Sequence, residues 1–317
     1  MKVAFVDTVH EALWNGLTDN GFDCYDCTQT SIDEIISKAF DFEGIVVRSR
    51  FPMNAEFLDH FGELKFIARS GAGMENIDLE YCERRSIQLF NAPEGNRNAV
   101  AEHALGMLLC MFNKIHTADR EVRSGIWDRE GNRGVELDGK KVGIIGYGNN
   151  GAAFAKKLKG FDVEVLAYDK YKTGFENDHV KEVSMDELMY MSDVVSLHIP
   201  QNEETLALID ATFIKKMKKP FYLINLSRGK IVKTADLLLG INDGKVLGAC
   251  LDVLEYEKSS FENMFENENM SDSFKALLNS EKVLLSPHVG GWTVESYQKL
   301  SEVLLAKILA HYKDELH

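Results

Sequence analysis

The chain has 317 residues, of which 45% are hydrophobic and 27% charged, values that are ordinary for a soluble globular protein of about two domains. Its formal net charge of −14 argues against partnership with nucleic acid or an anionic membrane surface, because both partners are themselves negative. No run of 18 apolar residues is present, and Asp7 interrupts the N-terminus, so we expect no membrane span, no signal peptide and a cytoplasmic protein.

The first ninety residues alternate between short apolar runs and amphipathic runs. Strands are predicted at 2–7, 43–49, 64–70 and 87–91, and helices at 31–40, 54–61 and 77–85. This alternation predicts a parallel sheet with helices on both faces. The turn after the first strand has no glycine loop, so the region has the architecture of a nucleotide-binding domain without its phosphate-binding turn.

An apolar-rich helical segment is predicted from Asn98 to about Trp127, followed by a polar connection at 131–140. A second series of strands is predicted at 141–145, 163–169, 194–200, 222–228, 246–253 and 282–288, and a last helix at 294–312. We therefore predict an α/β protein of two Rossmann-like, doubly wound parallel-sheet domains. The acidic segment from Ser259 to Ser280 is interpreted as a surface excursion.

Two short motifs are interpreted without a special function. Cys24 and Cys27 form a C-x-x-C pair, but no second pair or nearby histidine completes a zinc site, so we predict reduced, half-buried thiols and no metal. The tetrapeptide "KDEL" at 313–316 is followed by His317, so we interpret it as the polar end of the last helix rather than a retrieval signal.

The stretch "VGIIGYGNNGAAFAKKL" at 142–158 carries a G-x-G-x-x-G turn between a predicted strand and a predicted helix. Gly146 permits the tight turn, Gly148 lets a pyrophosphate approach the backbone, and Gly151 lets helix and strand pack closely. The N–H groups at the helix start suit a phosphate. A packed glycine turn with no ligand is the alternative interpretation, and the context makes it the weaker one.

An acid at the end of the next strand indicates which dinucleotide binds. Asp169 follows Gly151 by 18 residues (169 − 151), near the usual offset of about 20. A carboxylate there accepts hydrogen bonds from ribose hydroxyls and repels a 2′-phosphate, so we predict NAD rather than NADP. Lys170 and Lys172 oppose this preference, because basic residues nearby tolerate the phosphate.

Three polar residues follow apolar strands of the second series, namely Arg228, Glu257 and His288. An arginine binds a carboxylate bidentately and polarises a carbonyl. A histidine gives a proton to the carbonyl oxygen, and a glutamate beside it favours the imidazolium. Singly each has an ordinary alternative, an ion pair, a solvated surface or a strand-end cap. Together they predict interconversion of a 2-oxo acid and a 2-hydroxy acid.

With these residues in place, the chain resembles the D-isomer-specific 2-hydroxyacid dehydrogenases over almost its whole length. The segments that carry the resemblance are "RSGAGMENID", "NAPEGNRNAVAEHALGMLL", "ELDGKKVGIIGYGNNG", "SDVVSLHIPQNEET", "LINLSRGKIV", "GACLDVLEYE" and "LLSPHVGG". The resemblance implies that His288 is the acid/base, that Glu257 orients and charges it, and that Arg228 anchors the substrate. The glutamate also distinguishes this branch from formate dehydrogenases, which carry Gln there.

The resemblance further implies a set of cofactor contacts and a domain arrangement. The expected NAD-binding residues are Gly146, Tyr147, Gly148, Asn149, Asn150, Gly151, Asp169, Ile199, Pro200, Thr205, Leu226, Ser227 and Asp252. Residues 99–289 are expected to form the NAD-binding Rossmann domain. Residues 1–98 and 290–317 are expected to form a flavodoxin-like substrate-binding lid domain. A homodimer built through the cofactor domains is the family's usual state.

The expected substrate contacts lie in the first domain. Arg48, with Ser49, and Arg69 lie at the ends of predicted strands, and the backbone near Ala72 and Gly73 is placed to hold a carboxylate. Two extra arginines fit a second anionic group, as in the D-3-phosphoglycerate dehydrogenases, which these segments resemble. The alternative is that these arginines pair with surface acids.

Departures from the family pattern leave other functions open. Trp292 stands where a small polar residue is common, which would narrow the pocket for hydroxypyruvate, glyoxylate or pyruvate, or else pack at a hinge. Asn150 stands where an aliphatic residue is usual. Because the sequence ends at 317, we expect it to lack the regulatory domain of longer phosphoglycerate dehydrogenases. Besides a phosphoglycerate-type enzyme of serine biosynthesis, we consider a glyoxylate/hydroxypyruvate reductase and an NAD(H)-sensing corepressor-like protein.

Overall fold

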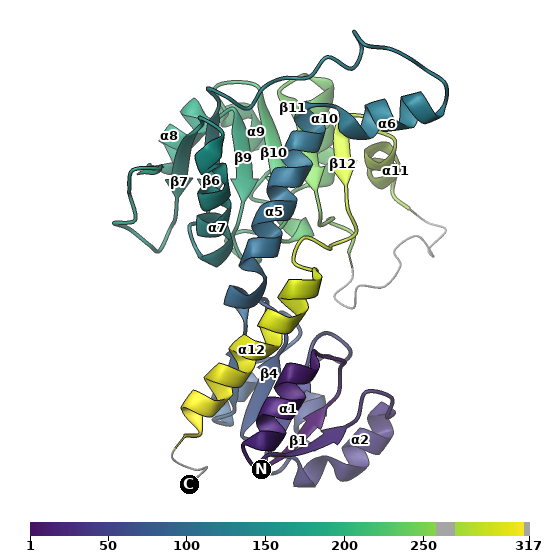
Figure 1. Ribbon diagram of the computed structural model, residues 1–317, viewed down its shortest axis with the longest axis vertical. Coiled ribbons are helices and arrows are strands. Elements are labelled where there is room, and N and C mark those ends of the chain that lie inside the picture. The colour runs from purple at the N-terminus through teal and green to yellow at the C-terminus, as the bar shows by residue number, and fades with distance from the viewer. Residues whose placement is uncertain (258–269, 314–317) are drawn as a thin grey trace. The chain divides into compact units, whose positions relative to one another are not determined.

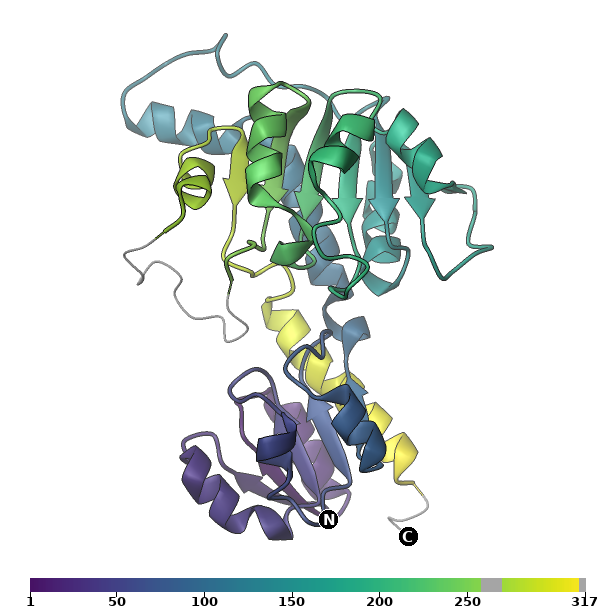
Figure 2. The ribbon, with the colours of Figure 1, turned by 180° about the vertical axis from the view of Figure 1, so that it is seen from behind.

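A computed structural model of the chain describes residues 1–257 and 270–313. The described residues divide into two compact units, unit 1 with 1–97 and 292–313, and unit 2 with 98–257 and 270–291. Each unit is built on one parallel sheet with helices on both faces (Figures 1 and 2), so the α/β prediction is confirmed. Among the described residues, none of the helices combines the length and apolar character that crossing a bilayer requires.

The sheet of unit 1 has five parallel strands in the order β2-β1-β3-β4-β5. They are β1 (Lys2–Phe5), β2 (Asp23–Asp26), β3 (Gly44–Val47), β4 (Phe66–Arg69) and β5 (Gln88–Asn91). This is the flavodoxin-like order, in which the chain reverses direction across the sheet between β1 and β3. Loops that follow these two strands therefore border a crevice at their carboxyl ends.

The helices of unit 1 cover the two faces of its sheet. On one face lie α1 (Glu11–Asp19) and α12 (Val294–His311), and on the other α2 (Ile32–Lys38), α3 (Ala55–Leu58) and α4 (Leu79–Arg84). Leu13, Leu17, Leu304 and Ile308 are fully buried under the first pair. Thr293 caps α12, so the predicted last helix begins where its capping box requires.

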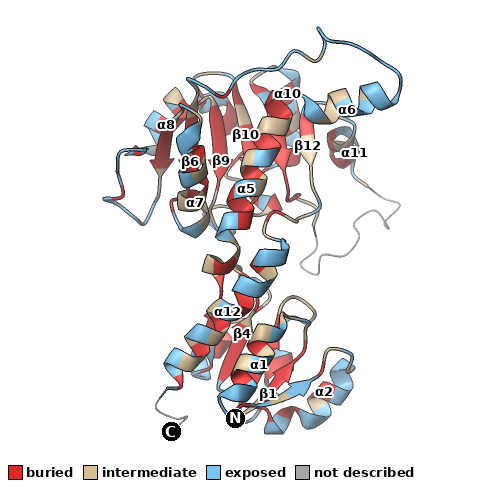
Figure 3. Ribbon diagram, viewed as in Figure 1, coloured by how far each residue is buried: buried red, intermediate tan, exposed pale blue. Residues whose placement is uncertain are grey.

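The sheet of unit 2 has seven parallel strands in the order β12-β11-β10-β9-β6-β7-β8. They are β6 (Lys141–Ile145), β7 (Glu164–Tyr168), β8 (Val180–Glu182), β9 (Val194–Leu197), β10 (Phe221–Asn225), β11 (Val246–Leu251) and β12 (Val283–Leu285). The order is that of a dinucleotide-binding fold with one added strand, and its switch point lies between β6 and β9. The central strands are buried on both faces, as Figure 3 shows.

Two groups of helices cover the sheet of unit 2. On one face lie α5 (Pro93–Phe112), from residue 98 onward, and α7 (Asn149–Lys157). On the other lie α8 (Met185–Met191), α9 (Ala211–Lys216), α10 (Thr234–Asn242) and α11 (Asp272–Leu278). Figures 1 and 2 show these two layers from opposite sides. Side-chain caps at Ser184, Asp210 and Ser271 set where three of these helices begin.

The helical segment predicted from Asn98 to Trp127 is corrected in two respects. It starts earlier, because α5 begins at Pro93, and proline suits the first helical position. It is also interrupted, because Lys114 has a left-handed φ of 51° and α6 (Ile115–Arg123) follows as a separate helix. Helix α1 and strand β2 were not predicted, and β2 is a polar edge strand that contains Cys24, with Cys27 directly after it.

The acidic segment predicted as a surface excursion is corrected in its described part. Residues 258–269 lie outside the described part of the chain. From Ser271 onward the segment forms α11, whose Phe274 and Leu277 are buried in the core of unit 2. Their spacing of three residues places both on one helix face. The sequence-based interpretation relied on the acidic composition of the segment and did not use this spacing.

Candidate active site

The glycine turn joins β6 to α7 at the switch point of unit 2. Gly146 has a φ of +94°, and a Cβ there would collide with the carbonyl oxygen of His198. A Cβ at Gly151 would collide with the carbonyl oxygen of Gly146, whereas a Cβ at Gly148 would meet nothing within 4 Å. Two glycines therefore serve packing, and the third borders open space at the positive end of a nine-residue helix. This arrangement fits a pyrophosphate.

A buried acceptor lies in the first turn of α7. Within the described residues, the amide oxygen of Asn150 is buried and has no hydrogen-bond partner. Buried polar atoms without partners are rare, and Asn150 follows Gly148 by two residues in the same turn. Asn150 therefore fits a site that a ligand completes.

Asp169 lies beside the glycine turn, directly after β7. One carboxylate oxygen accepts the N–H of Tyr147 at 2.7 Å, and the other accepts the N–H groups of Tyr171 at 2.9 Å and Lys172 at 3.0 Å. The carboxylate thus ties the turn after β6 to the turn after β7. Three backbone donors hold the negative charge in place while leaving the lone-pair capacity of a carboxylate partly open.

The other expected cofactor residues border the same end of the sheet. Ile199, Pro200 and Thr205 follow β9, and the hydroxyl of Thr205 donates to the carbonyl of Pro200 at 2.7 Å, which closes this loop on itself. Leu226 and Ser227 follow β10 and are buried, and Ser227 donates to the carbonyl of Leu197 at 2.6 Å. These loops therefore flank the switch point of the sheet.

The backbone of His198 packs against the glycine turn at Gly146. Its backbone N–H donates to the carbonyl of Ile145 at 2.8 Å, and its ring nitrogen Nε2 lies 2.9 Å from the hydroxyl of Ser196. Burial lowers the pKa of His198 to about 4. The ring is therefore neutral in the folded protein at neutral pH.

This depressed pKa predicts a specific acid sensitivity. Because the unfolded chain binds a proton near pH 6.5 and the folded chain only near pH 4, stability is lost as the pH falls between these values. When the pH falls from 7 to 4.5, we expect the free energy of unfolding to decrease by about 1–3 kcal/mol less in His198→Gln than in the wild type. Urea titrations of both proteins at the two pH values measure this difference. Equal losses would show that His198 does not titrate in this way.

Glu257 and His288 are in direct contact. His288 follows β12, and its Nδ1 lies 2.8 Å from the carboxylate oxygen Oε2 of Glu257. The other carboxylate oxygen accepts the N–H of Leu254 at 2.6 Å, which fixes the glutamate in the turn after β11. Their side chains are 25% and 19% exposed. A contact through Nδ1 directs Nε2 to any proton exchange with a substrate.

Arg228 follows the neighbouring strand β10. Its guanidinium donates to the carbonyl of Ser227 at 2.6 Å, and its own carbonyl accepts from the side-chain amide of Asn225 at 3.0 Å. A Cβ at Gly229 would collide with the carbonyl oxygen of Leu254, so the loop of Arg228 packs against the loop of Glu257. The three expected catalytic residues thus lie at the carboxyl ends of three adjacent strands, β10, β11 and β12.

Asp252 anchors the turn that carries His288. Its buried carboxylate accepts the N–H groups of Val289 at 2.9 Å and Gly290 at 2.8 Å, and its carbonyl accepts the N–H of His288 at 2.8 Å. His288 has a left-handed φ of 54°, a conformation that costs energy in a residue other than glycine. The bonds to Asp252 hold this conformation in place.

Sequence reasoning missed two residues that support Asp252. The hydroxyl of Ser286 donates to Asp252 at 2.5 Å, and Nε2 of His103 lies 2.9 Å from the same hydroxyl oxygen. Because the single hydroxyl proton goes to Asp252, Nε2 of His103 carries the proton that it shares with Ser286. His103 comes from α5, 149 residues before Asp252 (252 − 103) in the chain, and no local pattern links the two.

The expected substrate residue Arg48 lies in unit 1, at the switch point between β1 and β3. The backbone N–H groups of Arg48, Ser49 and Arg50 all donate to one carboxylate oxygen of Asp7, at 2.6, 2.9 and 3.0 Å. The chain thus fills this anion-binding turn with its own carboxylate. The guanidinium of Arg50 binds three backbone carbonyls and has a structural role.

Two contacts position Arg48 and Arg69. The guanidinium of Arg48 stacks on the ring of Trp292, 4.2 Å from its centroid, and Arg69 donates through Nε to the carbonyl of Arg48 at 3.2 Å. Near them, Asn91 donates to the carbonyl of Ala72 at 2.7 Å, and Gly73 is adjacent. Trp292 therefore packs against the expected anion-binding arginine, which is a cation–π contact.

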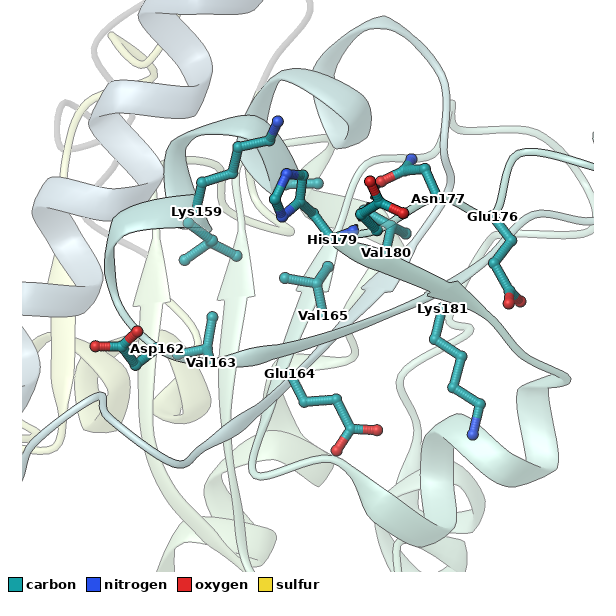
Figure 4. Close-up of a pocket in the computed structure, with 13 residues that line it drawn as sticks. Lys159, Asp162, Val163, Glu164, Val165, Glu176, Asn177, His179, Val180 and Lys181 are labelled. Carbon is teal, nitrogen blue, oxygen red and sulfur yellow. Dashed lines mark hydrogen bonds between the residues drawn. The ribbon is translucent and has the colours of Figure 1, made fainter.

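A separate cavity of about 650 Å³ opens at the amino ends of β7 and β8. Figure 4 shows its charged lining, which includes Lys159, Asp162, Glu164, His179 and Lys181. The glycine turn lies at the opposite, carboxyl end of the same sheet. The cavity is therefore distinct from the site described above, and its mixture of charges gives it no preference for an anion.

Several known proteins are similar to this chain. The family model described as "D-isomer specific 2-hydroxyacid dehydrogenase, NAD binding domain" matches residues 105–290. A D-3-phosphoglycerate dehydrogenase of Archaeoglobus fulgidus is 36% identical over 98% of this chain and 57% of its own length. The chain therefore spans little more than half of that relative.

Two further similarities cover more than four fifths of both chains. A glyoxylate reductase of Thermofilum pendens is 32% identical over 90% of this chain and 83% of its own length. The solved structure of a D-lactate dehydrogenase from Aquifex aeolicus, complexed with NAD and lactic acid, is 27% identical with a TM-score of 0.82. That comparison covers 100% of this chain and 96% of the other.

Proposed function

Since the chain belongs to the D-isomer-specific 2-hydroxyacid dehydrogenases, we propose that it interconverts a 2-oxo acid and a D-2-hydroxy acid with NAD as the cofactor. The observation that carries this proposal is the 2.8 Å contact between Glu257 and His288, which together with Arg228 follow adjacent strands at their carboxyl ends. A proton donor with a carboxylate partner and a carboxylate-binding cation are the groups that this reaction needs.

The proposed NAD site is the switch point of unit 2. NAD supplies the hydride carrier of the reaction. The helix start beyond Gly148 suits its pyrophosphate, Asp169 suits a ribose diol, and Leu226 and Ser227 lie further along the same end of the sheet. Asp252 is a proposed contact as well, although its carboxylate also holds the turn of His288.

In the reductive direction, the chain's own residues would bind the substrate and move one proton. Arg228 would bind the 2-oxo acid through its carboxylate and polarise the adjacent carbonyl. His288 would give the proton on Nε2 to the carbonyl oxygen as hydride reaches the carbon, while Glu257 stabilises the imidazolium through Nδ1. In the oxidative direction the same proton returns to His288.

The proposed substrate carries a second anionic group, as a phosphorylated acid of serine biosynthesis does. Arg48 and Arg69 are linked through the carbonyl of Arg48 and follow neighbouring strands β3 and β4, with Ala72 and Gly73 close behind in the chain. Two guanidinium groups at one sheet end suit a phosphate better than a neutral group. The relative that is 36% identical is named a D-3-phosphoglycerate dehydrogenase.

A glyoxylate or hydroxypyruvate reductase is the second candidate. Trp292 covers one face of the Arg48 guanidinium, which reduces the surface that the arginine offers to a large anion. A relative of 32% identity is named a glyoxylate reductase. These two observations favour a small unphosphorylated acid.

One assay separates these functions. NADH oxidation by the purified protein is compared with phosphohydroxypyruvate, hydroxypyruvate, glyoxylate and pyruvate at equal concentration. A clear preference for the phosphorylated acid supports the phosphoglycerate-type function, and a preference for a small acid supports the reductase. Tight NADH binding without turnover of any substrate would contradict both and support an NAD(H) sensor.

We also propose a homodimer formed through unit 2. Helix α6 has no buried residue, although it carries large apolar side chains. Ile115 and Val122 on it are 55% and 53% exposed, and Ile126 and Trp127 just beyond it are 51% and 79% exposed. Four large apolar side chains on one exposed helix and its extension suit a protein interface.

All five cysteines are free, which suits the proposed cytoplasmic location.

The dimer proposal predicts the effect of a charge at its centre. Trp127→Glu is expected to raise the dimer dissociation constant by about 100-fold or more, because a buried unpaired carboxylate is costly. Light scattering across a concentration series measures the mass. Leu239→Glu, at an exposed apolar residue of α10, is the matched control and should leave the mass unchanged. A wild-type monomer at all concentrations would contradict the proposal.

A further inference from the structure

One acidic side chain links two segments that border the proposed NAD site, the loop after β9 and residues 169–172. These two segments together are called the rim below. Glu204, in the loop after β9, accepts on a single carboxylate oxygen both the ammonium of Lys170 and the phenol of Tyr171, each at 2.6 Å. Lys170 and Tyr171 directly follow Asp169, the proposed ribose-binding residue. Glu204 therefore connects the loop after β9 to the segment that begins with Asp169, the proposed ribose-binding residue.

A second lysine, Lys172, follows in the same segment and contacts Tyr147 of the glycine turn. The ammonium of Lys172 is 3.4 Å from the carbonyl oxygen of Tyr147 and 5.3 Å from the centroid of the Tyr147 ring. Tyr147 is also the residue whose N–H binds Asp169. Lys172 is thus held over the glycine turn, whereas Lys170 is held by Glu204.

The charges of this rim balance. Asp169 and Glu204 contribute two negative charges, and Lys170 and Lys172 contribute two positive charges, so the sum is zero. Hydrogen bonds from Lys170 and Tyr171 lower the pKa of Glu204, and the bond to Glu204 raises the pKa of Lys170. Both partners are therefore ionised at neutral pH, and the balance holds there.

We propose that Glu204 is a specificity-determining residue, which favours NAD over NADP by neutralising Lys170 and by adding a second negative charge at the rim. The proposal rests on the proposed NAD site. A 2′-phosphate carries a charge of about −1.5 to −2, and it would lie where Asp169 meets the ribose. With Glu204 present, the two lysines offer it no net attraction. Without that carboxylate, the rim gains a net positive charge and a released ammonium group.

The test compares the affinities of the two reduced cofactors directly. Dissociation constants of NADH and NADPH are measured by nicotinamide fluorescence at low ionic strength, with no substrate present. Glu204→Gln is expected to shift the ratio of the two constants toward NADPH by about threefold to tenfold. Lys170 and Glu204 are each 52% exposed, so the shift should shrink in 0.5 M salt, where screening is strong.

Two variants separate this role from a general change in charge. Glu203→Gln alters net charge equally in the same loop, but the Glu203 side chain forms no ion pair with another described residue, so its ratio should change less than about twofold. Lys170→Gln combined with Glu204→Gln restores the balance of the rim and should return the ratio to within about twofold of wild type. Asp169→Ser is the positive control and should shift the ratio toward NADPH.

The outcomes are distinguishable. An unchanged ratio in Glu204→Gln, or an equal shift in Glu203→Gln, overturns the role of Glu204 while leaving the NAD site intact. A double variant that keeps the full shift overturns the part assigned to Lys170. A wild-type protein that binds neither cofactor overturns the NAD site itself, and this inference with it.

Discussion

His288→Gln is expected to lower kcat by about 10²- to 10⁴-fold, while the dissociation constant of NADH stays within about threefold of wild type. The glutamine keeps a polar group near Glu257, but it cannot carry a proton to the substrate oxygen. The Nδ1 contact with Glu257 at 2.8 Å and the anchoring of the turn by Asp252 give this histidine one orientation. Steady-state rates with the best 2-oxo acid and NADH fluorescence titration measure the two quantities.

A second histidine provides the control for this variant. His179 is exposed and lines the cavity at the amino ends of β7 and β8, away from the proposed active site. His179→Gln should retain wild-type kcat. If His288→Gln also turns over normally while binding NADH, the acid/base role would have to move to another group. If it loses NADH binding as well, the defect lies in the fold of the turn rather than in proton transfer.

The parts of the site that sequence reasoning reached are those with a local signature. A strand, three glycines and a helix start are contiguous in the chain, and Asp169 follows at the distance that one helix and one strand require. Arg228 and His288 each come three residues after the end of an apolar strand, β10 and β12 respectively. Because parallel strands present their carboxyl ends at one edge, local patterns were sufficient to predict that such residues gather there.

The parts that it missed depend on contacts between distant segments. Asp7 fills the backbone turn of Arg48 to Arg50 from 41 residues away (48 − 7), and Nε2 of His103 lies 2.9 Å from the hydroxyl of Ser286 and 3.6 Å from the carboxylate of Asp252. No spacing rule relates these residues, since their contacts arise from strand order and helix packing. The order β2-β1-β3 places Asp7 beside Arg48, and sheet order cannot be obtained from periodicity alone.

Element boundaries were missed where local signals are weak. The break between α5 and α6 has neither proline nor glycine at its centre, only Asn113 and the left-handed Lys114. Because lysine is uncommon in the left-handed conformation, its presence at 114 does not predict the end of a helix. The apolar pattern gave no other sign of a break. The break makes α6 a separate helix whose apolar side chains Ile115 and Val122 are exposed.

Arg228→Lys is expected to lower kcat/KM for the 2-oxo acid by roughly 10²-fold, because a lysine keeps the charge but loses the two parallel hydrogen bonds that a guanidinium gives a carboxylate. The backbone around Arg228 is fixed independently of its side chain, by the Asn225 bond to its carbonyl and by the close packing of Gly229 on Leu254. The variant should therefore fold normally and bind NADH with unchanged affinity.

The division of this loss between KM and kcat identifies what Arg228 does. A rise in KM alone would assign it to holding the carboxylate equally in the ground and transition states, whereas a fall in kcat would assign it to polarising the carbonyl as hydride arrives. Arg133→Lys, at an exposed residue paired with Glu130, is the matched control and should leave both constants unchanged. Wild-type kcat/KM in Arg228→Lys would remove the arginine from substrate binding.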